Sequence, residues 1–120
     1  MATLTKQRIA QNGLAPTFVA AAGGGDKVRV RDEPDSGGRT FLVVKNGSGA
    51  SVTVTLDDPN SSAPVGALQF NPDVAVAVPA GAERWIGPLS DGRFTNDSDG
   101  LVAWTYSAVT SVTVAVMTIG

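Results

Sequence analysis

Short alternating segments of apolar and polar residues, separated by turn residues, run through most of the chain. Val52, Val54 and Leu56 alternate with hydroxyl residues, which is the period-two pattern of a strand that buries one face. Residues 27–31 alternate basic residues with valine and predict a strand with one solvated face. Similar patterns predict further strands at residues 17–21, 40–45, 74–78, 83–86, 101–108 and 111–119.

The turn residues between these segments predict how the strands connect. Asn46-Gly47 lies between residues 40–45 and 51–57 and favours a tight hairpin, because both residues accept positive φ angles. The proline-containing segment 58–72 predicts a connection that crosses between sheets. Seven or eight strands at this spacing predict an all-β fold, namely a single small antiparallel β-sandwich or barrel of the jelly-roll kind.

The first 25 residues differ from the rest of the chain. Residues 1–13 are polar without a strand period and predict an arm with at most a short helical turn. The run of glycines at 23–25 predicts a flexible joint. We therefore divide the chain into an N-terminal arm and joint at 1–25, with room for one short strand, and a β-sandwich domain at 26–120. We expect the arm to bind a partner and to lie outside the core.

Composition narrows the function. The 120 residues suffice for one domain. The sequence contains neither cysteine nor histidine, which removes the thiolate nucleophile, the usual zinc ligands and the usual general base. An enzyme is therefore the least favoured class, and we expect no catalytic residues, cofactor or metal.

Charge and hydropathy bear on partners and compartment. The net charge of −2 does not favour a nucleic-acid partner. No apolar run approaches the roughly 20 residues that span a bilayer, so no membrane partner is expected. Pro16 and the polar residues 11–13 interrupt the only segment that resembles a secretory signal. We expect a protein that is made and kept in a cytoplasm, or in an assembly built there.

Three groups of side chains are candidates for binding. Lys27, Arg29 and Arg31 share one face of the strand predicted at 27–31. That face is either solvated or in contact with an acidic protein neighbour. Asn96-Asp97-Ser98-Asp99-Gly100 resembles the start of a calcium loop, but no later bidentate glutamate follows, and a turn is favoured. Asp57 and Asp58 are adjacent and are expected to be solvated turn carboxylates.

The aromatic residues favour a core over a sugar site. Trp104 and Tyr106 share a strand face with Val102, which indicates burial. A carbohydrate-binding module would need an exposed Trp85, or an exposed Trp104 with Tyr106.

The last predicted strand is apolar on both faces. Its valines at 112, 114 and 116 suffice for one core face, and Ala115, Met117 and Ile119 lie on the other. Either these three residues contact another chain, which we favour, or the N-terminal arm or the 58–72 connection covers them.

Four stretches together carry a family resemblance. They are residues 13–18 (GLAPTF), 35–47 (DSGGRTFLVVKNG), 76–88 (VAVPAGAERWIGP) and 102–115 (VAWTYSAVTSVTVA). The chain resembles capsid-decoration (head-stabilising) and minor head proteins of tailed bacteriophages, especially those of actinobacteria.

The resemblance implies a structural protein of the virion. It implies binding to the outer surface of the assembled head, contact with the major capsid protein, a homo-oligomer with a trimer favoured, and synthesis in the host bacterial cytoplasm. No functional side chain transfers from the resemblance. Two alternatives stay open: another virion part, such as a head–tail connector or tail component, and a carbohydrate-binding module on the virion surface.

Overall fold

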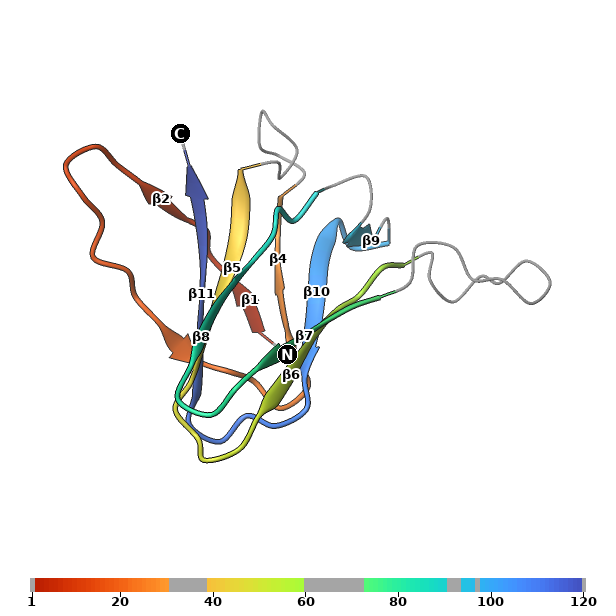
Figure 1. The fold of residues 1–120 in the computed structure, drawn as a ribbon. Coiled ribbons are helices and arrows are strands. Elements are labelled where there is room, and N and C mark those ends of the chain that lie inside the picture. Colours follow the sequence, from red (N-terminus) through yellow and green to blue (C-terminus); the bar gives the residue numbers. More distant parts are fainter. Residues whose placement is uncertain (1, 31–38, 60–72, 91–93, 97, 120) are drawn as a thin grey trace.

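The computed structural model describes residues 2–30, 39–59, 73–90, 94–96 and 98–119 (Figure 1). Among these residues the chain forms eleven strands. They are β1 (Ala2–Leu4), β2 (Gln7–Ile9), β3 (Val19–Ala20), β4 (Asp26–Val28), β5 (Thr40–Asn46), β6 (Val52–Leu56), β7 (Val74–Val78), β8 (Glu83–Ile86), β9 (Thr95–Asn96), β10 (Leu101–Tyr106) and β11 (Val112–Ile119).

The strands form two sheets that pack against each other. The first sheet has the order β1-β4-β10-β6-β7, with β9 also paired to β10, and the second has the order β2-β11-β5-β8, with β3 also paired to β11. The predicted all-β sandwich is confirmed. Both sheets are mixed, because β1 runs parallel to β4 and β2 runs parallel to β11. The strands beyond the expected seven or eight are pieces of two or three residues.

The core lies between the sheets and follows the alternation of the strands. Leu42 and Val44 of β5 point inward from the second sheet, and Val52, Val54 and Trp104 point inward from the first. All five side chains are buried. The predicted burial of Trp104 is confirmed, and a half-buried Tyr106 packs against the same cluster.

The expected hairpin between residues 40–45 and 51–57 is wrong. β5 lies in the second sheet and β6 in the first, so the segment after Asn46 is a corner between sheets. Neither Asn46 nor Gly47 has a positive φ. The buried Asn46 side chain donates from Nδ2 to the carbonyl oxygens of Val78 (2.9 Å) and Ala50 (2.8 Å), and the Gly47 amide donates to the carbonyl of Ser111 (2.8 Å). These contacts with other segments favour the corner over the tight turn.

The predicted crossing between sheets after β6 is also wrong. β6 and β7 are antiparallel neighbours in the first sheet, paired from Val52↔Val78 to Leu56↔Val74. The segment between them therefore joins adjacent strands and does not cross between sheets. Residues 60–72 lie outside the described residues.

The N-terminal segment is part of both sheets, which corrects the expectation of an arm outside the core. β1 pairs with β4, and after residues 5 and 6 the chain crosses over so that β2 pairs with β11 (Figure 1). No helical turn forms at residues 2–13. Leu4 packs against the core, and hydrogen bonding to β4 and β11 satisfies backbone groups that a free arm would leave to water.

The glycine run is a tight turn and not a flexible joint. Gly25 is buried with φ +94°, and its amide donates to the carbonyl of Ala22 (2.9 Å). The turn leads from β3 of the second sheet into β4 of the first. It therefore fixes a crossing between the sheets.

Candidate binding surface on the second sheet

The outer face of the second sheet is apolar because β5, β8 and β11 all place apolar residues there. Val43 of β5 lies between Ala115 of β11 and Trp85 of β8 in the strand register. Phe41 lies one pleat away, opposite Met117. The period of two that sends Leu42 and Val44 into the core therefore sends Phe41, Val43 and Lys45 outward.

Part of this face is covered by the chain's own N-terminal segment. Ala115 (2% exposed) and Met117 (4% exposed) form a second cluster with Val43. Ile9, Leu14, Phe18 and Phe41 pack against this cluster. The prediction that Ala115 and Met117 form an exposed self-association surface is therefore wrong, and coverage by the N-terminal segment is confirmed. Ile119 at the end of β11 remains 53% exposed.

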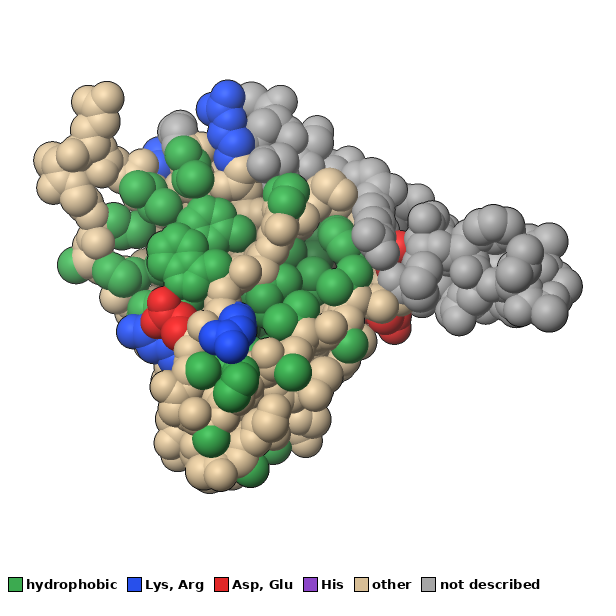
Figure 2. All heavy atoms as spheres, in the orientation of Figure 1, with side chains coloured by type: hydrophobic (Ala, Val, Ile, Leu, Met, Phe, Trp, Pro, Cys, Tyr) green, Lys and Arg blue, Asp and Glu red, His purple; other side chains and the backbone are tan. Residues whose placement is uncertain are grey.

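Trp85 is the most exposed large side chain of this face. The residue is 62% exposed, and its ring stacks on that of Phe41, with the ring centroids 5.1 Å apart and the planes at 15°. We call this pair the aromatic ridge. Figure 2 shows green side chains gathered on the side where β8 runs in Figure 1. An aromatic residue this exposed contributes little to the core and marks a candidate contact.

A short polar rim fixes one end of the ridge. The Trp85 indole Nε1 donates to Glu83 Oε2 at 2.6 Å. Lys45 Nζ lies 3.9 Å from Glu83 Oε1 and 4.0 Å from the centroid of the Phe18 ring. Trp85 thus has its polar atom satisfied within the chain and presents an apolar ring face to the outside.

Two shallow hollows flank Trp85. One, of about 250 Å³, is bounded by Leu14, Phe18 and Met117 on the side of the N-terminal segment. The other, of about 300 Å³, is bounded by Phe41 and Ile119. Trp85 lines both hollows, and Phe41 lines the second one only, so the Trp85 side chain lies between the two. Ala115, Met117 and Ile119 of the predicted interface all lie on this face of the second sheet, but of the three Ile119 alone is exposed.

The basic residues of the predicted interface lie elsewhere. Lys27 is in β4 of the first sheet, and its Nζ lies 2.8 Å from Asp99 Oδ2. This hydrogen bond from Lys27 lowers the pKa of the Asp99 carboxyl, and the amide of Leu101 adds to the effect. The Arg29 guanidinium lies beside Gly100, which is in the same turn as Asp99. Arg31 lies outside the described residues, and the six predicted interface residues do not form one site.

The segment resembling a calcium loop is a turn, as favoured. Asn96 Oδ1 accepts hydrogen bonds from the Ser98 amide (3.0 Å) and hydroxyl (2.7 Å). Asp99 Oδ1 accepts from the Leu101 amide (3.0 Å), and Gly100 has φ +72°. Asp97 lies outside the described residues. Among the residues that the structure describes, no group of three acidic, histidine or cysteine side chains is arranged to hold a metal ion.

The pair of aspartates after β6 is less solvated than expected. Asp58 is 1% exposed, and its amide donates to Asp73 Oδ1 at 2.9 Å, which closes the end of the β6–β7 pair. Burial raises the pKa of Asp57, and the nearby charges of Asp73 and Asp58 raise it further. The prediction of solvated turn carboxylates is therefore wrong for Asp58.

Replacing Asp57 by asparagine is expected to stabilise the protein at neutral pH. Because the pKa of Asp57 is raised in the folded protein, its ionised form is less favourable there than in the unfolded chain. The stabilisation is expected to disappear as the pH falls below the ordinary pKa of 3.8, where both states are protonated. Urea unfolding of wild type and Asp57→Asn at pH 7 and pH 3 checks this. Equal differences at both pH values would contradict the assignment.

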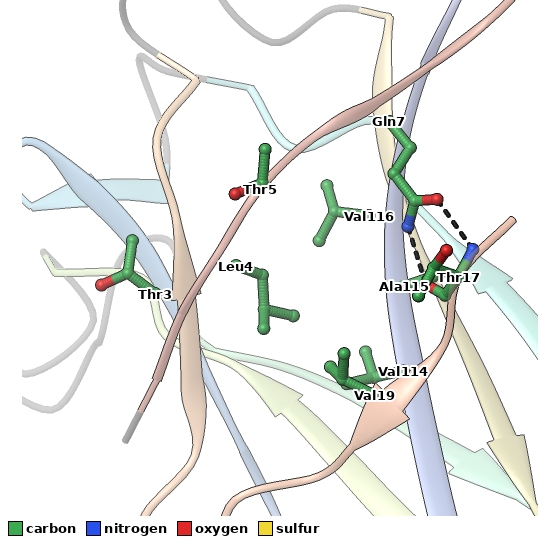
Figure 3. A pocket seen from close by; sticks show the side chains of 9 residues that line it. All are labelled: Thr3, Leu4, Thr5, Gln7, Thr17, Val19, Val114, Ala115 and Val116. Carbon is green, nitrogen blue, oxygen red and sulfur yellow. Dashed lines mark hydrogen bonds between the residues drawn. The ribbon is translucent and has the colours of Figure 1, made fainter.

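A cavity lies where the N-terminal segment crosses between the sheets (Figure 3). It has a volume of about 380 Å³ and is lined by Leu4, Val19 and residues 114–116 of β11, together with three threonines and Gln7 of the N-terminal segment. The Gln7 amide exchanges two 2.8 Å hydrogen bonds with the backbone of Thr17, donating to its carbonyl and accepting from its N–H. The cavity presents no ionisable side chain, and Gln7 ties β2 to the segment before β3.

The sequence held a signal for the aromatic ridge. Glu83 and Trp85 are two residues apart in a strand and share a face, and Phe41, Val43 and Lys45 share another. What the sequence did not contain was the β5–β8 pairing that places Val43 beside Trp85 and Lys45 beside Glu83.

Among the described residues, no helix is both long enough and apolar enough to cross a membrane. Comparisons of the chain with protein-family models, with curated proteins and with solved structures found no match.

Proposed function

We propose that the protein is a non-enzymatic capsid-decoration protein that binds the outer surface of an assembled phage head through the aromatic ridge. Two observations support this. The sequence resembles head-stabilising proteins over four separate stretches, and the sandwich presents an exposed Trp85 stacked on Phe41. The exposed ridge is the observation that carries the proposal. The protein would act at the capsid surface of the virion after synthesis in the host cytoplasm.

The ridge has the properties of a protein contact. Tryptophan is enriched among residues that dominate binding energy, above all where a polar rim surrounds an apolar centre. Trp85 is oriented by Phe41 below it and Glu83 beside it, so little side-chain freedom is lost on binding. A capsid presents many equivalent sites, so modest contacts repeated over the shell can stabilise the lattice.

Replacing Trp85 by alanine is expected to weaken binding to heads that lack the protein by about 30-fold or more, the loss typical of a central tryptophan. The fold is expected to remain intact because Trp85 is 62% exposed. Thr105→Ala on the outer face of the first sheet is the control, since Thr105 is also exposed. Cosedimentation of each variant with heads measures binding. Unchanged binding by a folded Trp85→Ala variant would refute the proposed surface.

A carbohydrate-binding module is the second candidate. Trp85 is exposed and could contact a sugar, whereas Trp104 is buried and could not. A flat indole beside a hollow of about 300 Å³ offers a stacking surface for a sugar ring. Binding of the isolated protein to host cell-wall glycans, lost in Trp85→Ala, together with unchanged capsid binding, would favour this alternative. A head–tail connector or tail component would instead be revealed by a low copy number in an image reconstruction of the particle.

A further inference from the structure

Within the described part of the chain, β7 is the least protected edge strand of the sandwich. Among the described residues, the strands that pair on one side only are β1, β7 and β9 in the first sheet and β2, β3 and β8 in the second, and β3 and β9 have two residues each. β1 and β2 have three residues each, and β8 contains Glu83 and Arg84. β7 has five residues, Val74–Val78, with no charged residue and no proline. Natural proteins shorten, charge or cover such edges, because the exposed backbone groups can pair with another strand.

Four of the five β7 side chains are also only half-buried or exposed. Val74 and Val76 point toward the core but are only half-buried. Ala75 and Ala77 point to the outer face and are exposed. Their neighbours across β6 are Thr55 and Thr53, so the outer face beside the edge is uncharged as well. A second strand paired with β7 could therefore extend the row of core-facing valines, and β7 would place no charged side chain beside it.

The sequence of β7, V-A-V-A-V, reads the same in both directions. In an antiparallel pair of two such strands centred on Val76, valine therefore lies opposite valine, and Ala75 lies opposite Ala77 of the other copy. Asp73, which precedes β7, then lies at one end of the pair in one copy and at the other end in the second copy. A parallel pair would bring these aspartates together. Charge and shape thus both favour the antiparallel arrangement.

We propose that β7 pairs with β7 of a second copy of this chain across a two-fold axis at Val76, joining the first sheets of the two copies into one continuous sheet. The contact buries the half-exposed valines and satisfies the edge backbone of both copies. It also predicts a dimer in solution, in place of the trimer that the family resemblance implies. It is independent of the aromatic ridge, which lies on the other sheet.

Two double variants test the register. Ala75→Lys with Ala77→Lys places lysine opposite lysine in the proposed pair. Ala75→Lys with Ala77→Glu places lysine opposite glutamate, at the same exposed positions and with the same number of new charges. Wild type is expected to sediment at twice the 12.2 kDa chain mass. The lysine pair is expected to weaken the dimer by about tenfold or more, and the lysine–glutamate pair to retain it.

A single cysteine provides a direct test of the axis. The chain has no cysteine of its own. Directly opposed residues in an antiparallel pair have Cα atoms about 4.5–5.5 Å apart, within disulfide range. Val76→Cys is therefore expected to form a covalent dimer on mild oxidation, and the exposed Thr105→Cys is not. A monomeric or trimeric wild type, equal behaviour of the two double variants, or equal cross-linking of the two cysteines would each overturn the proposal.

Discussion

Replacing Trp104 by alanine is expected to cost about 3–5 kcal/mol of unfolding free energy, the usual loss for a buried aromatic residue. The side chain is 0% exposed and belongs to the main core cluster. Since small domains are stable by only about 5–15 kcal/mol, the variant is expected to be partly unfolded at 37 °C. Urea unfolding followed by circular dichroism measures the loss.

The loss at Trp104 includes a polar component. The indole Nε1 donates to the Tyr106 hydroxyl at 2.8 Å, and that hydroxyl donates to Oδ2 of the buried Asp26 at 2.6 Å. Burial and the bond to Asp26 raise the pKa of Tyr106, so this phenol keeps its proton. Trp104→Phe, which retains an aromatic ring but no N–H, is expected to lose less than Trp104→Ala.

Trp85→Ala is the matched control for the same residue type. Trp85 is 62% exposed and makes its single stacking contact with Phe41, so its loss is expected to cost less than about 1 kcal/mol, as most surface changes do. Equal destabilisation by the Trp85 and Trp104 replacements would contradict the assignment of one tryptophan to the core and the other to a surface.

Strand positions could be predicted because alternation is a local property of the sequence. The limits of the strands at 74–78 and 83–86 match the structure to the residue. Strand pairing could not be predicted in the same way, as Asn46-Gly47 illustrates. Asn46 is held by Val78, and Gly47 by Ser111. These partners lie 32 and 64 residues further along the chain, and no local preference for a hairpin includes them.

The segment that covers the outer face of β11 could not be predicted for a similar reason. Alternation revealed that Ala115 and Met117 had to be hidden from water, and it left open whether another chain or the same chain does this. The answer depends on where residues 9–18 run. These residues have no strand period between Ile9 and Phe18, and they are held by the pairing of β2 and β3 with β11 at either end.

The basic face of β4 shows the same limit for charges. The sequence left two environments open for Lys27, namely a face exposed to water or a contact with an acidic neighbouring protein. The partner is Asp99, 72 residues away in the turn before β10. Because β4 and β10 are antiparallel neighbours, the turn that leads into β10 comes to lie beside Lys27. A prediction of charge partners therefore requires the sheet order first.

Replacing Gly25 by alanine is expected to be the most damaging glycine substitution in the described part of the chain. Gly25 has φ +94°, and a Cβ added there would lie 2.2 Å from the carbonyl oxygen of Trp104. The backbone strain costs about 1–3 kcal/mol. The clash adds about 1–3 kcal/mol, since overpacking forces the backbone to shift. The oxygen belongs to the central strand β10, which cannot move without disturbing its pairing with β4 and β6.

Gly81→Ala separates the two contributions. Gly81 has φ +72° in the turn between β7 and β8, and a Cβ there meets no atom within 4 Å. It therefore carries the strain of a positive φ without the clash. Thermal melts of both variants are expected to show a clearly larger loss for Gly25→Ala, by several degrees for each kcal/mol in a domain of this size. Equal losses would mean that the turn at residues 23–25 can move away from β10, and that the glycine run is a joint after all.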